Sequence, residues 1–298
     1  MVYDIVLLTA KKFLNSPTLN KYNSNVILED NIVKDELDKL GLKTKIISWS
    51  DKNFDFTQTK LALFRTIWDY FDRFIEFKIW LEKVKNQTIL INSYQTINWN
   101  MDKHYLLDLQ NNGINIPESI FIHKGEKINF QEIFKNKKFN EIVIKPTVSG
   151  AARNTFRLSK SNYQQKEKLI INLLKTQDFI IQPFIKSITS FGEISIMLIN
   201  GEYTHSVIKK AKKGDYRVQD DHGGSVELFI PTKEQINFAI KTYNACNPKP
   251  LYARVDIIID NNQKLAISEI ELIEPEFWYR FNKLSATKIA KSIKSKYF

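Results

Sequence analysis

Short apolar runs alternate with a helix-like segment at the start of the chain, and this alternation restricts the fold more than any other feature. Residues 2–8 and 44–49 are apolar enough to form buried strands. Between them, residues 31–41 carry apolar side chains at helical spacing and end in Gly41, a residue type that commonly follows a helix. A strand, a helix and a second strand of this kind predict a parallel sheet with helices on its faces.

The same pattern continues to about residue 100. We predict a third strand over residues 60–66, an aromatic helix over 68–84 and a fourth strand over 89–93. Residues 1–100 are therefore expected to form an N-terminal α/β domain. We assign substrate recognition to this domain, because parallel sheets present ligands at the ends of their strands.

Beyond residue 100 the predicted strands are shorter, and polar turns separate them. A helix is predicted to end at Gly113, and a basic amphipathic helix closes the chain. The expected strands cover residues 141–146, 179–185, 193–199, 253–260 and 264–273. We expect two α+β lobes, 101–186 and 187–298, behind the N-terminal domain, so the predicted fold class is α/β.

Composition restricts the functional class. The 298 residues include 44 Lys and Arg against 33 Asp and Glu, a net charge of +11 that favours anionic partners. The single cysteine, Cys246, excludes an internal disulfide and suits a cytoplasmic protein. No apolar run is long enough to span a bilayer, so no membrane partner is expected. We assign Lys209, Lys210, Lys212 and Lys213 to a solvated face.

Three carboxylates are predicted to converge on the last two strands. Asp256 lies on the first of them, and Glu269 and Glu271 lie two apart on the second, so both glutamates project from one face. Buried carboxylates need counter-ions, and ligands that are all oxygen suit Mg²⁺. The pattern fits equally well an edge strand whose acids face water. The residues alone leave both interpretations open.

Two other segments have features of phosphate sites. Lys145 ends an apolar strand, and a loop of small residues over 146–152 lets backbone N–H groups approach a phosphate. Residues 214–224 form a second loop, rich in glycine and cationic, in which Arg217 can clamp an oxyanion. Each segment also fits a plain solvated turn. The four histidines show no metal-ligand spacing to one another along the chain.

In their order, these segments resemble the ATP-grasp superfamily, in the branch that holds glutathione synthetase, D-alanine:D-alanine ligase and ribosomal-protein glutamate ligases. The likeness covers nearly the whole chain and is most marked to ATP-grasp ligases of the D-cycloserine biosynthesis type. It rests on the segments RTIWDYFDRFIEFKIWL, NWNMDKHYLLDL and EIELIEP. The resemblance implies an ATP-grasp fold behind an N-terminal α/β domain, and an ATP-dependent ligase that forms C–N bonds.

Positions that match the motifs of the family receive roles from the resemblance. Arg217 and Arg254 are implied as catalytic cations, and Asp256, Glu269 and Glu271 as ligands of two Mg²⁺ ions, for which Mn²⁺ can substitute. Among the ATP-binding positions, the lysines match phosphate contacts, residues 182–185 match the adenine hinge, and the glutamate matches the ribose contact. The implied ATP-binding residues are Lys103, Lys145, Ser149, Gly150, Ala151, Gln182, Pro183, Phe184, Ile185 and Glu193.

The match weakens at the substrate end. Many relatives have Glu-x-Asn where this chain has residues 269–271, and they continue into Ser-Pro-Gly where this chain reads Leu-Ile-Glu-Pro. The expected substrate contacts come from the end of the third strand and from the second loop. They are Arg65, Asp69, Tyr70, His222, Gly223 and Gly224. Arg65 and Asp69 equally fit a salt bridge with each other at a helix start.

Three functions stay open on the sequence. The first is a carboxylate–amine ligase or cycloligase that activates a carboxylate as an acyl phosphate and transfers it within or to an amino-acid derivative. The second is a peptide- or protein-modifying ligase, because a charge of +11 attracts acidic peptides. The third is a non-catalytic protein regulated by nucleotide or bound to nucleic acid, against which the intact metal triad argues. The expected cofactors are ATP and Mg²⁺, the expected partner is a small-molecule or peptide carboxylate, and a homodimer stays open.

Overall fold

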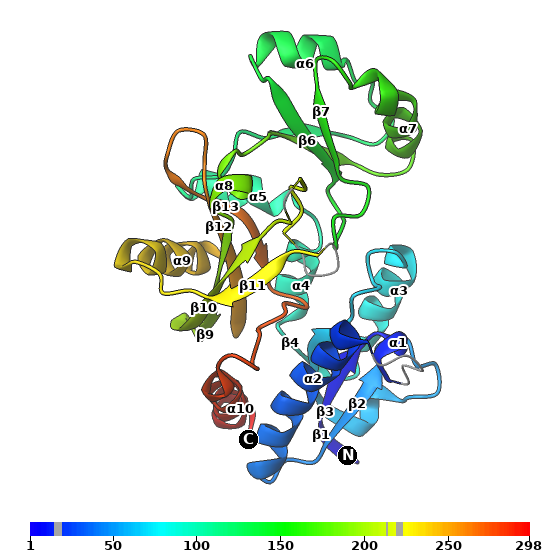
Figure 1. Ribbon diagram of the computed structural model, residues 1–298. Coiled ribbons are helices and arrows are strands. Elements are labelled where there is room, and N and C mark those ends of the chain that lie inside the picture. The colour runs from blue at the N-terminus through cyan, green and yellow to red at the C-terminus, as the bar shows by residue number, and fades with distance from the viewer. Residues whose placement is uncertain (15–19, 213, 219–222) are drawn as a thin grey trace.

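Three sheets that follow one another along the chain form the framework of the protein. The structure, a computed structural model, describes residues 1–14, 20–212, 214–218 and 223–298. In Figure 1 the N-terminal sheet lies at one end of the molecule and the second sheet at the other, with the third sheet between them. Among the described residues, no helix combines the length and the apolar composition that a membrane span requires.

The N-terminal sheet has the strand order β2-β1-β3-β4, and its neighbouring strands are parallel, as the alternation of apolar runs predicts. Its strands are β1 (Tyr3–Thr9), β2 (Thr44–Ser48), β3 (Thr59–Thr66) and β4 (Ile89–Ile91). The connecting helices are α1 (Lys11–Leu14), α2 (Lys21–Lys39), the short 3-10 helix η1 (Phe56–Gln58) and α3 (Phe74–Val84). Side chains from both faces of β1 and β3 are buried, which is typical of a parallel sheet covered on two sides.

Helix α3 begins later than the aromatic pattern predicts, because residues 68–73 form turns. Trp68 Nε1 donates to the carbonyl oxygen of Glu274 at 2.8 Å, and Trp49 Nε1 donates to Asp69 at 2.7 Å. These long-range contacts outweigh the helix propensity of the segment. They leave Tyr70 buried at the edge of a cavity between the sheets.

The second sheet is antiparallel, with the order β5-β8-β6-β7. Its strands are β5 (Ile120–Ile122), β6 (Glu141–Pro146), β7 (Phe156–Ser159) and β8 (Phe179–Pro183), and its helices are α6 (Phe130–Asn136) and α7 (Gln164–Leu174). Ile142 and Ile144 of β6 point into a core with Phe130 and Ile170 from the two helices. The alternation of buried and partly exposed residues along β6 leaves Lys145 on the opposite face.

The third sheet is also antiparallel, with the order β11-β10-β9-β12-β13. Its strands are β9 (Glu193–Ile199), β10 (Glu202–Lys210), β11 (Ser225–Leu228), β12 (Tyr252–Ile259) and β13 (Leu265–Glu271). The helices of this region are α4 (Tyr94–Asn100), α5 (Tyr105–Asn111), α8 (Ser187–Ser190) and α9 (Lys233–Ala245). Leu106 and Leu109 of α5 belong to the same core as Ile196 of β9 and Ala239 of α9, so α5 packs with the third sheet.

The last helix, α10 (Lys283–Tyr297), returns the chain to the N-terminal domain. Its buried face, which includes Ile289 and Ile293, shares a core with Val33 and Leu37 of α2. Figure 1 shows α10 beside α2, although the two helices lie at opposite ends of the sequence. The end of the chain therefore stabilises the N-terminal α/β domain.

Candidate active site

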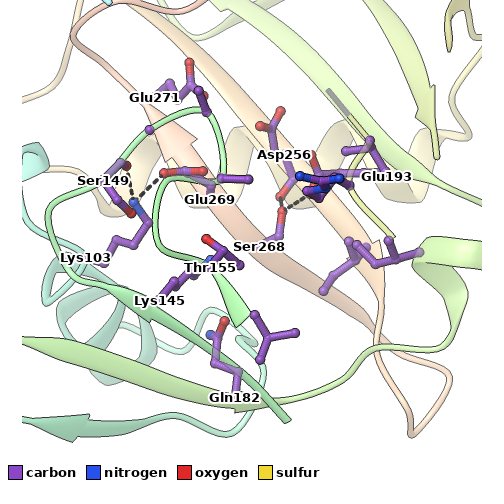
Figure 2. A pocket seen from close by; sticks show the side chains of 18 of the residues that line it. Lys103, Lys145, Ser149, Thr155, Gln182, Glu193, Asp256, Ser268, Glu269 and Glu271 are labelled. Atoms are coloured by element: carbon purple, nitrogen blue, oxygen red, sulfur yellow. Dashed lines mark hydrogen bonds and ion pairs between the residues drawn. The ribbon is translucent and has the colours of Figure 1, made fainter. Parts of the chain in front are cut away.

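A cavity lies between the second and third sheets, and Tyr70 of the N-terminal domain reaches its wall. Figure 2 shows the carboxylates at one side of this cavity and Gln182 at the other, with Lys145 between them. The structure brings together most of the positions predicted for the site. The predicted residues that line the cavity are Tyr70, Lys103, Lys145, Ser149, Gly150, Ala151, Gln182, Pro183, Phe184, Ile185, Glu193, Arg217, Arg254, Asp256, Glu269 and Glu271.

Strand register places the three carboxylates side by side. In the β12–β13 ladder, Asp256 pairs with Glu269 and Arg254 pairs with Glu271. Because side chains alternate along each strand, all four project toward the cavity. β13 is an edge strand, yet the Glu269 and Glu271 side chains are only 33% and 24% exposed. The acids therefore face a cavity and not open water.

Asp256 is the most buried of these acids, and two cations neutralise it. Lys209 Nζ lies 3.0 Å and an Arg254 terminal nitrogen 2.8 Å from Asp256 Oδ2, while Ser195 Oγ donates to Oδ1 at 2.6 Å. Burial opposes ionisation of Asp256, but Arg254 and Lys209 outweigh it and hold the pKa of the carboxyl below its ordinary value. Asp256 is therefore an anion.

Glu269, the ladder partner of Asp256, has a different cation beside it. Its carboxylate lies 3.0 Å from Lys103 Nζ. Burial raises the pKa of Glu269, but Lys103 and Lys145 more than compensate, so the pKa lies below its ordinary value. Glu271 instead pairs with Arg254, and burial raises its pKa in spite of that partner. The two glutamates thus share one face of β13 but hold different partners.

Lys145 has the charge and the freedom to bind an anionic ligand. Burial lowers the pKa of its ammonium, and Glu269 acts against this shift. Among the described residues, no carboxylate lies within ion-pair distance of Lys145 Nζ. The cavity beside Glu269 therefore contains a lysine with no carboxylate partner in contact.

The small-residue loop after β6 is held close to these lysines. Lys103 Nζ donates to the carbonyl oxygen of Ser149 at 2.8 Å. A Cβ on Gly150 would lie 2.5 Å from the Phe71 ring, so only glycine fits this approach. Ala151 and Ala152 have φ values of 48° and 54°, a left-handed conformation that is costly for alanine. The loop is therefore folded over the cavity in a strained form.

The far end of the cavity, at the end of β8, is mainly apolar. Gln182 Nε2 donates to Ser119 Oγ at 3.0 Å, and the backbone N–H of Phe184 donates to the Glu141 carbonyl oxygen at 2.9 Å. Phe184 and Ile185 line this end. The apolar residues Pro117, Val143, Ile188 and Ile258 complete it.

Glu193 lies at the start of β9, where Lys209 Nζ contacts it at 2.5 Å and Ser268 Oγ donates to it at 2.7 Å. Lys209 thus bridges Glu193 and Asp256 and is buried, and its assignment to a solvated face was wrong. The burial cost is offset by its two carboxylates, which together keep the pKa of Lys209 above its ordinary value. Lys210 and Lys212 are exposed as predicted.

The second predicted loop is only partly described. Arg217 lines the cavity, and one of its terminal nitrogens lies 2.7 Å from Asp215. Lys213 and His222 lie outside the described residues. Gly223 and Gly224 are described but are absent from the cavity lining that the described residues form.

Of the three substrate contacts predicted in the N-terminal domain, only Tyr70 lines the cavity. Arg65 is fully buried against the Tyr279 ring and lies 3.5 Å from Asp30. Asp69 accepts hydrogen bonds from Trp49 and Arg73. Arg65 and Asp69 therefore pair with other residues and not with each other.

Two charged residues that line the cavity were missed as site residues, Lys209 and Glu274. Burial, and then Glu269, raise the pKa of Glu274 to about 7, and the nearby Tyr70 hydroxyl acts against this rise. The sequence did contain a signal for Glu274, because this chain has Leu-Ile-Glu-Pro where many relatives have Ser-Pro-Gly. For Lys209 the signal was its place two residues after Val207, on one face of an apolar strand.

Comparisons with known proteins match both the N-terminal domain and the rest of the chain. Residues 5–92 match the N-terminal domain of D-cycloserine synthetase DcsG, and residues 101–294 match the RimK-like ATP-grasp domain. The chain is 24% identical over 272 residues to the cycloserine biosynthesis protein DcsG of Streptomyces lavendulae, covering 85% of this chain and 89% of the relative.

Two solved structures share the fold. The crystal structure of D-cycloserine synthetase DcsG superposes with a TM-score of 0.87 at 21% identity and covers 99% of both chains. The macrocyclase MdnC from Microcystis aeruginosa, bound with its precursor peptide MdnA, gives a TM-score of 0.64 at 12% identity, over 98% of this chain and all of the other. The family match spans well over half of the sequence. The protein belongs to the RimK-like ATP-grasp domain family and is an ATP-grasp ligase, an enzyme that forms C–N bonds with ATP.

Proposed function

We propose that this ligase activates the carboxylate of a small amino-acid derivative as an acyl phosphate, which an amine or another nucleophile of the substrate then attacks. The observation that supports this most directly is the meeting of three carboxylates with Lys103 and Lys145 in one cavity. Such a site has cations for the phosphates of ATP and acids for metal ions, and it needs no covalent nucleophile.

Asp256, Glu269 and Glu271 would hold two Mg²⁺ ions, or Mn²⁺ in their place. The donor set fits, because all three are carboxylates and the glutamates open into the cavity. Bound Mg²⁺ supplies positive charge to the phosphoryl group during its transfer. Lys209 and Arg254 keep Asp256 ionised for this role.

The remaining groups of the cavity act on ATP and on the activated substrate. Lys145, free of a carboxylate contact, binds phosphate, and Lys103 positions the loop over 149–152 through its hydrogen bond to Ser149. The apolar end around Phe184 and Ile185 receives adenine. The substrate carboxylate forms a bond to the γ-phosphorus while the bond to ADP breaks, and Arg217 and Arg254 stabilise the charge on the transferring group.

The substrate lies beyond the carboxylates, where Tyr70 and Glu274 meet. This pair consists of one residue from the N-terminal domain and one from the segment after β13, and it can accept a hydrogen bond from an ammonium group. A small amino-acid derivative fits such a site. The similarity of residues 5–92 to the N-terminal domain of a synthetase that makes a small molecule supports this choice over a peptide.

ADP release is the direct test. The full chain with Mg-ATP is screened against pools of amino-acid derivatives and, separately, acidic peptides, with hydroxylamine added to trap an acyl phosphate as a hydroxamate. We expect ADP and hydroxamate with a pool of amino-acid derivatives. A response to peptides alone would assign the enzyme to the peptide-modifying ligases, and ADP release without hydroxamate from any pool would contradict the acyl phosphate.

A further inference from the structure

We propose that His104, His123 and Asp178 form a binding site for a transition-metal ion of the Zn²⁺ type, separate from the carboxylates of the cavity. One ligand atom from each residue lies within 4.8 Å of the other two. None of the three belongs to the cavity lining that the described residues form. The three come from separate parts of the chain, which is why sequence spacing gives no metal motif.

His104 is already oriented as metal-binding histidines are. It precedes α5, and its Nδ1 hydrogen-bonds Asp102 Oδ1 at 2.6 Å. Its ring stacks on Phe121, with ring centroids 4.4 Å apart. Nε2 is buried and has no hydrogen-bond partner among the described residues. A carboxylate on one ring nitrogen fixes the tautomer and leaves the other nitrogen as a ligand, which is the usual arrangement at protein metal sites.

Asp178 and His123 provide the other two ligands. Asp178 Oδ1 accepts the backbone N–H of Lys124 at 2.8 Å, so the carboxyl group is held in place, while Oδ2 lies 3.1 Å from His123 Nδ1. The His123 ring is parallel to that of His104, with centroids 5.6 Å apart. His123 is 61% exposed, so its ring can turn without disturbing a core.

The donor set selects the class of metal. Two imidazoles and one carboxylate suit Zn²⁺ and related ions, whereas Mg²⁺ requires oxygen ligands. Tetrahedral ligands about 2.0 Å from a metal lie roughly 3.3 Å from one another. The donor atoms must therefore approach by about 1.5 Å at most, and a turn of the exposed His123 ring provides that movement while water supplies the fourth ligand.

A metal ion at this site would join two parts of the fold. His123 follows β5 and Asp178 precedes β8 of the second sheet, while His104 precedes α5, the helix that packs with the third sheet. Asp102, which orients His104, also accepts a hydrogen bond from Thr147 Oγ1 at 3.2 Å, next to the small-residue loop. The bound ion would hold the second sheet against α5 and stiffen the wall of the cavity.

Cobalt binding tests the proposal, because Co²⁺ replaces Zn²⁺ and its visible absorption reports tetrahedral nitrogen and oxygen ligands. The full chain, freed of metal by a chelator, is titrated with Co²⁺ in excess Mg²⁺, which keeps the oxygen site of the cavity filled. We expect one Co²⁺ per chain, displaced by Zn²⁺. Absence of tetrahedral Co²⁺ absorption would overturn the proposal.

Three variants locate the ion. His123→Ala and Asp178→Asn each remove a ligand, and we expect either change to lower Co²⁺ affinity by about a hundredfold or more. Asp102→Asn removes only the group that orients His104. We expect it to lower Co²⁺ affinity less, by about 10- to 100-fold. Glu126→Gln is the matched control. It removes the same charge as Asp178→Asn, but from the loop that contains His123. Among the described residues, the Glu126 side chain accepts only the backbone N–H of His123, so affinity should not change.

Equal Co²⁺ affinity in the wild-type protein and in His123→Ala would place the ion elsewhere and refute the site. Thermal unfolding provides a second measurement. Zn²⁺ should raise the melting temperature of the wild-type protein and of Glu126→Gln but not that of His123→Ala, because an ion bound only to the folded state stabilises it. A similar rise in all three proteins would also refute the site.

Discussion

Glu269 and Glu271 show how two residues of one type on one face of a strand can differ in role. Glu269 lies against Lys103, next to Lys145, whereas Glu271 pairs with Arg254. If Glu269 holds a metal ion between lysines that bind phosphate, it must keep its negative charge. Glu271 can be replaced by a neutral oxygen donor, as many relatives have asparagine there.

We therefore predict that Glu269→Gln loses about a thousandfold in turnover, equivalent to several kcal/mol of transition-state stabilisation. Glu271→Asn should keep measurable turnover at a higher Mg²⁺ concentration. ADP production by both variants over a magnesium titration distinguishes them. Full activity of Glu269→Gln would show that the metal site is wrongly assigned.

His205 leads to a pH prediction that does not depend on the reaction. Its Nε2 donates to the carbonyl oxygen of Phe277 at 2.7 Å, and burial lowers its pKa from about 6.5 to about 4. The unfolded chain then binds a proton that the folded chain does not, so stability is complete above pH 6.5 and is lost as the pH falls toward 4. Between pH 7 and pH 5 this residue should cost about 2 kcal/mol of unfolding free energy.

Urea unfolding of the wild-type protein and of His205→Gln at both pH values measures this cost. Glutamine keeps a donor for Phe277 but does not titrate. The decrease in unfolding free energy from pH 7 to pH 5 should be about 2 kcal/mol smaller in the variant. Equal decreases in the two proteins would mean that His205 has an ordinary pKa in the folded state.

At the level of elements, sequence patterns predicted the strands and helices whose formation depends on residues close together in the sequence. The parallel sheet of β1–β4 and the convergence of the carboxylates on β12 and β13 were predicted from apolar runs and from alternation along strands, and the structure confirms both. The start of α3 was predicted too early, because Trp68 and Asp69 form hydrogen bonds to distant residues. The burial of Lys209 was also missed, since it depends on Glu193 and Asp256 from two other strands.

The loop that contains Arg217 leads to a prediction at this level. Arg217 pairs with Asp215 within its own loop and also lines the cavity, so it can exchange one anion for another when ATP binds. Arg217→Ala should lower kcat by one to two orders of magnitude and change the ATP KM much less, because the contact with the transferring phosphate strengthens in the transition state.

Lys210→Ala is the matched control for Arg217→Ala, because Lys210 is an exposed cation of the adjoining strand that pairs with Glu227. It should leave both constants unchanged. If Arg217→Ala raises KM and leaves kcat unchanged, Arg217 contributes only to ground-state binding and does not belong among the catalytic residues.

On the scale of the whole molecule, the active site depends on contacts that no local pattern encodes. Tyr70 and Glu274 line the same cavity although they lie about two hundred residues apart in the sequence, and α10 completes the core around α2. Sequence motifs could predict the site residues of the two lobes after residue 100, because the position of each residue depends on its own strand or loop. They could not show that Arg65 is enclosed by Asp30 and Tyr279 and does not line the cavity.

Because the cavity is formed by separate sheets, a ligand bound within it should stabilise the whole chain. We predict that Mg-ATP at about 100 times its Kd adds about 2.7 kcal/mol to the free energy of unfolding, and that the melting temperature rises by roughly 4 °C. ATP without Mg²⁺ should give a smaller rise, since the acids around Glu269 then repel the phosphates. Lys145→Ala should lose most of the Mg-ATP effect, because Lys145 is the lysine proposed to bind phosphate. The variant should still fold, since Lys145 has no ion-pair partner among the described residues and Glu269 keeps Lys103 as its partner. Differential scanning fluorimetry of both proteins, with and without Mg²⁺, makes the comparison, and an equal rise in Lys145→Ala would show that the nucleotide binds away from this lysine.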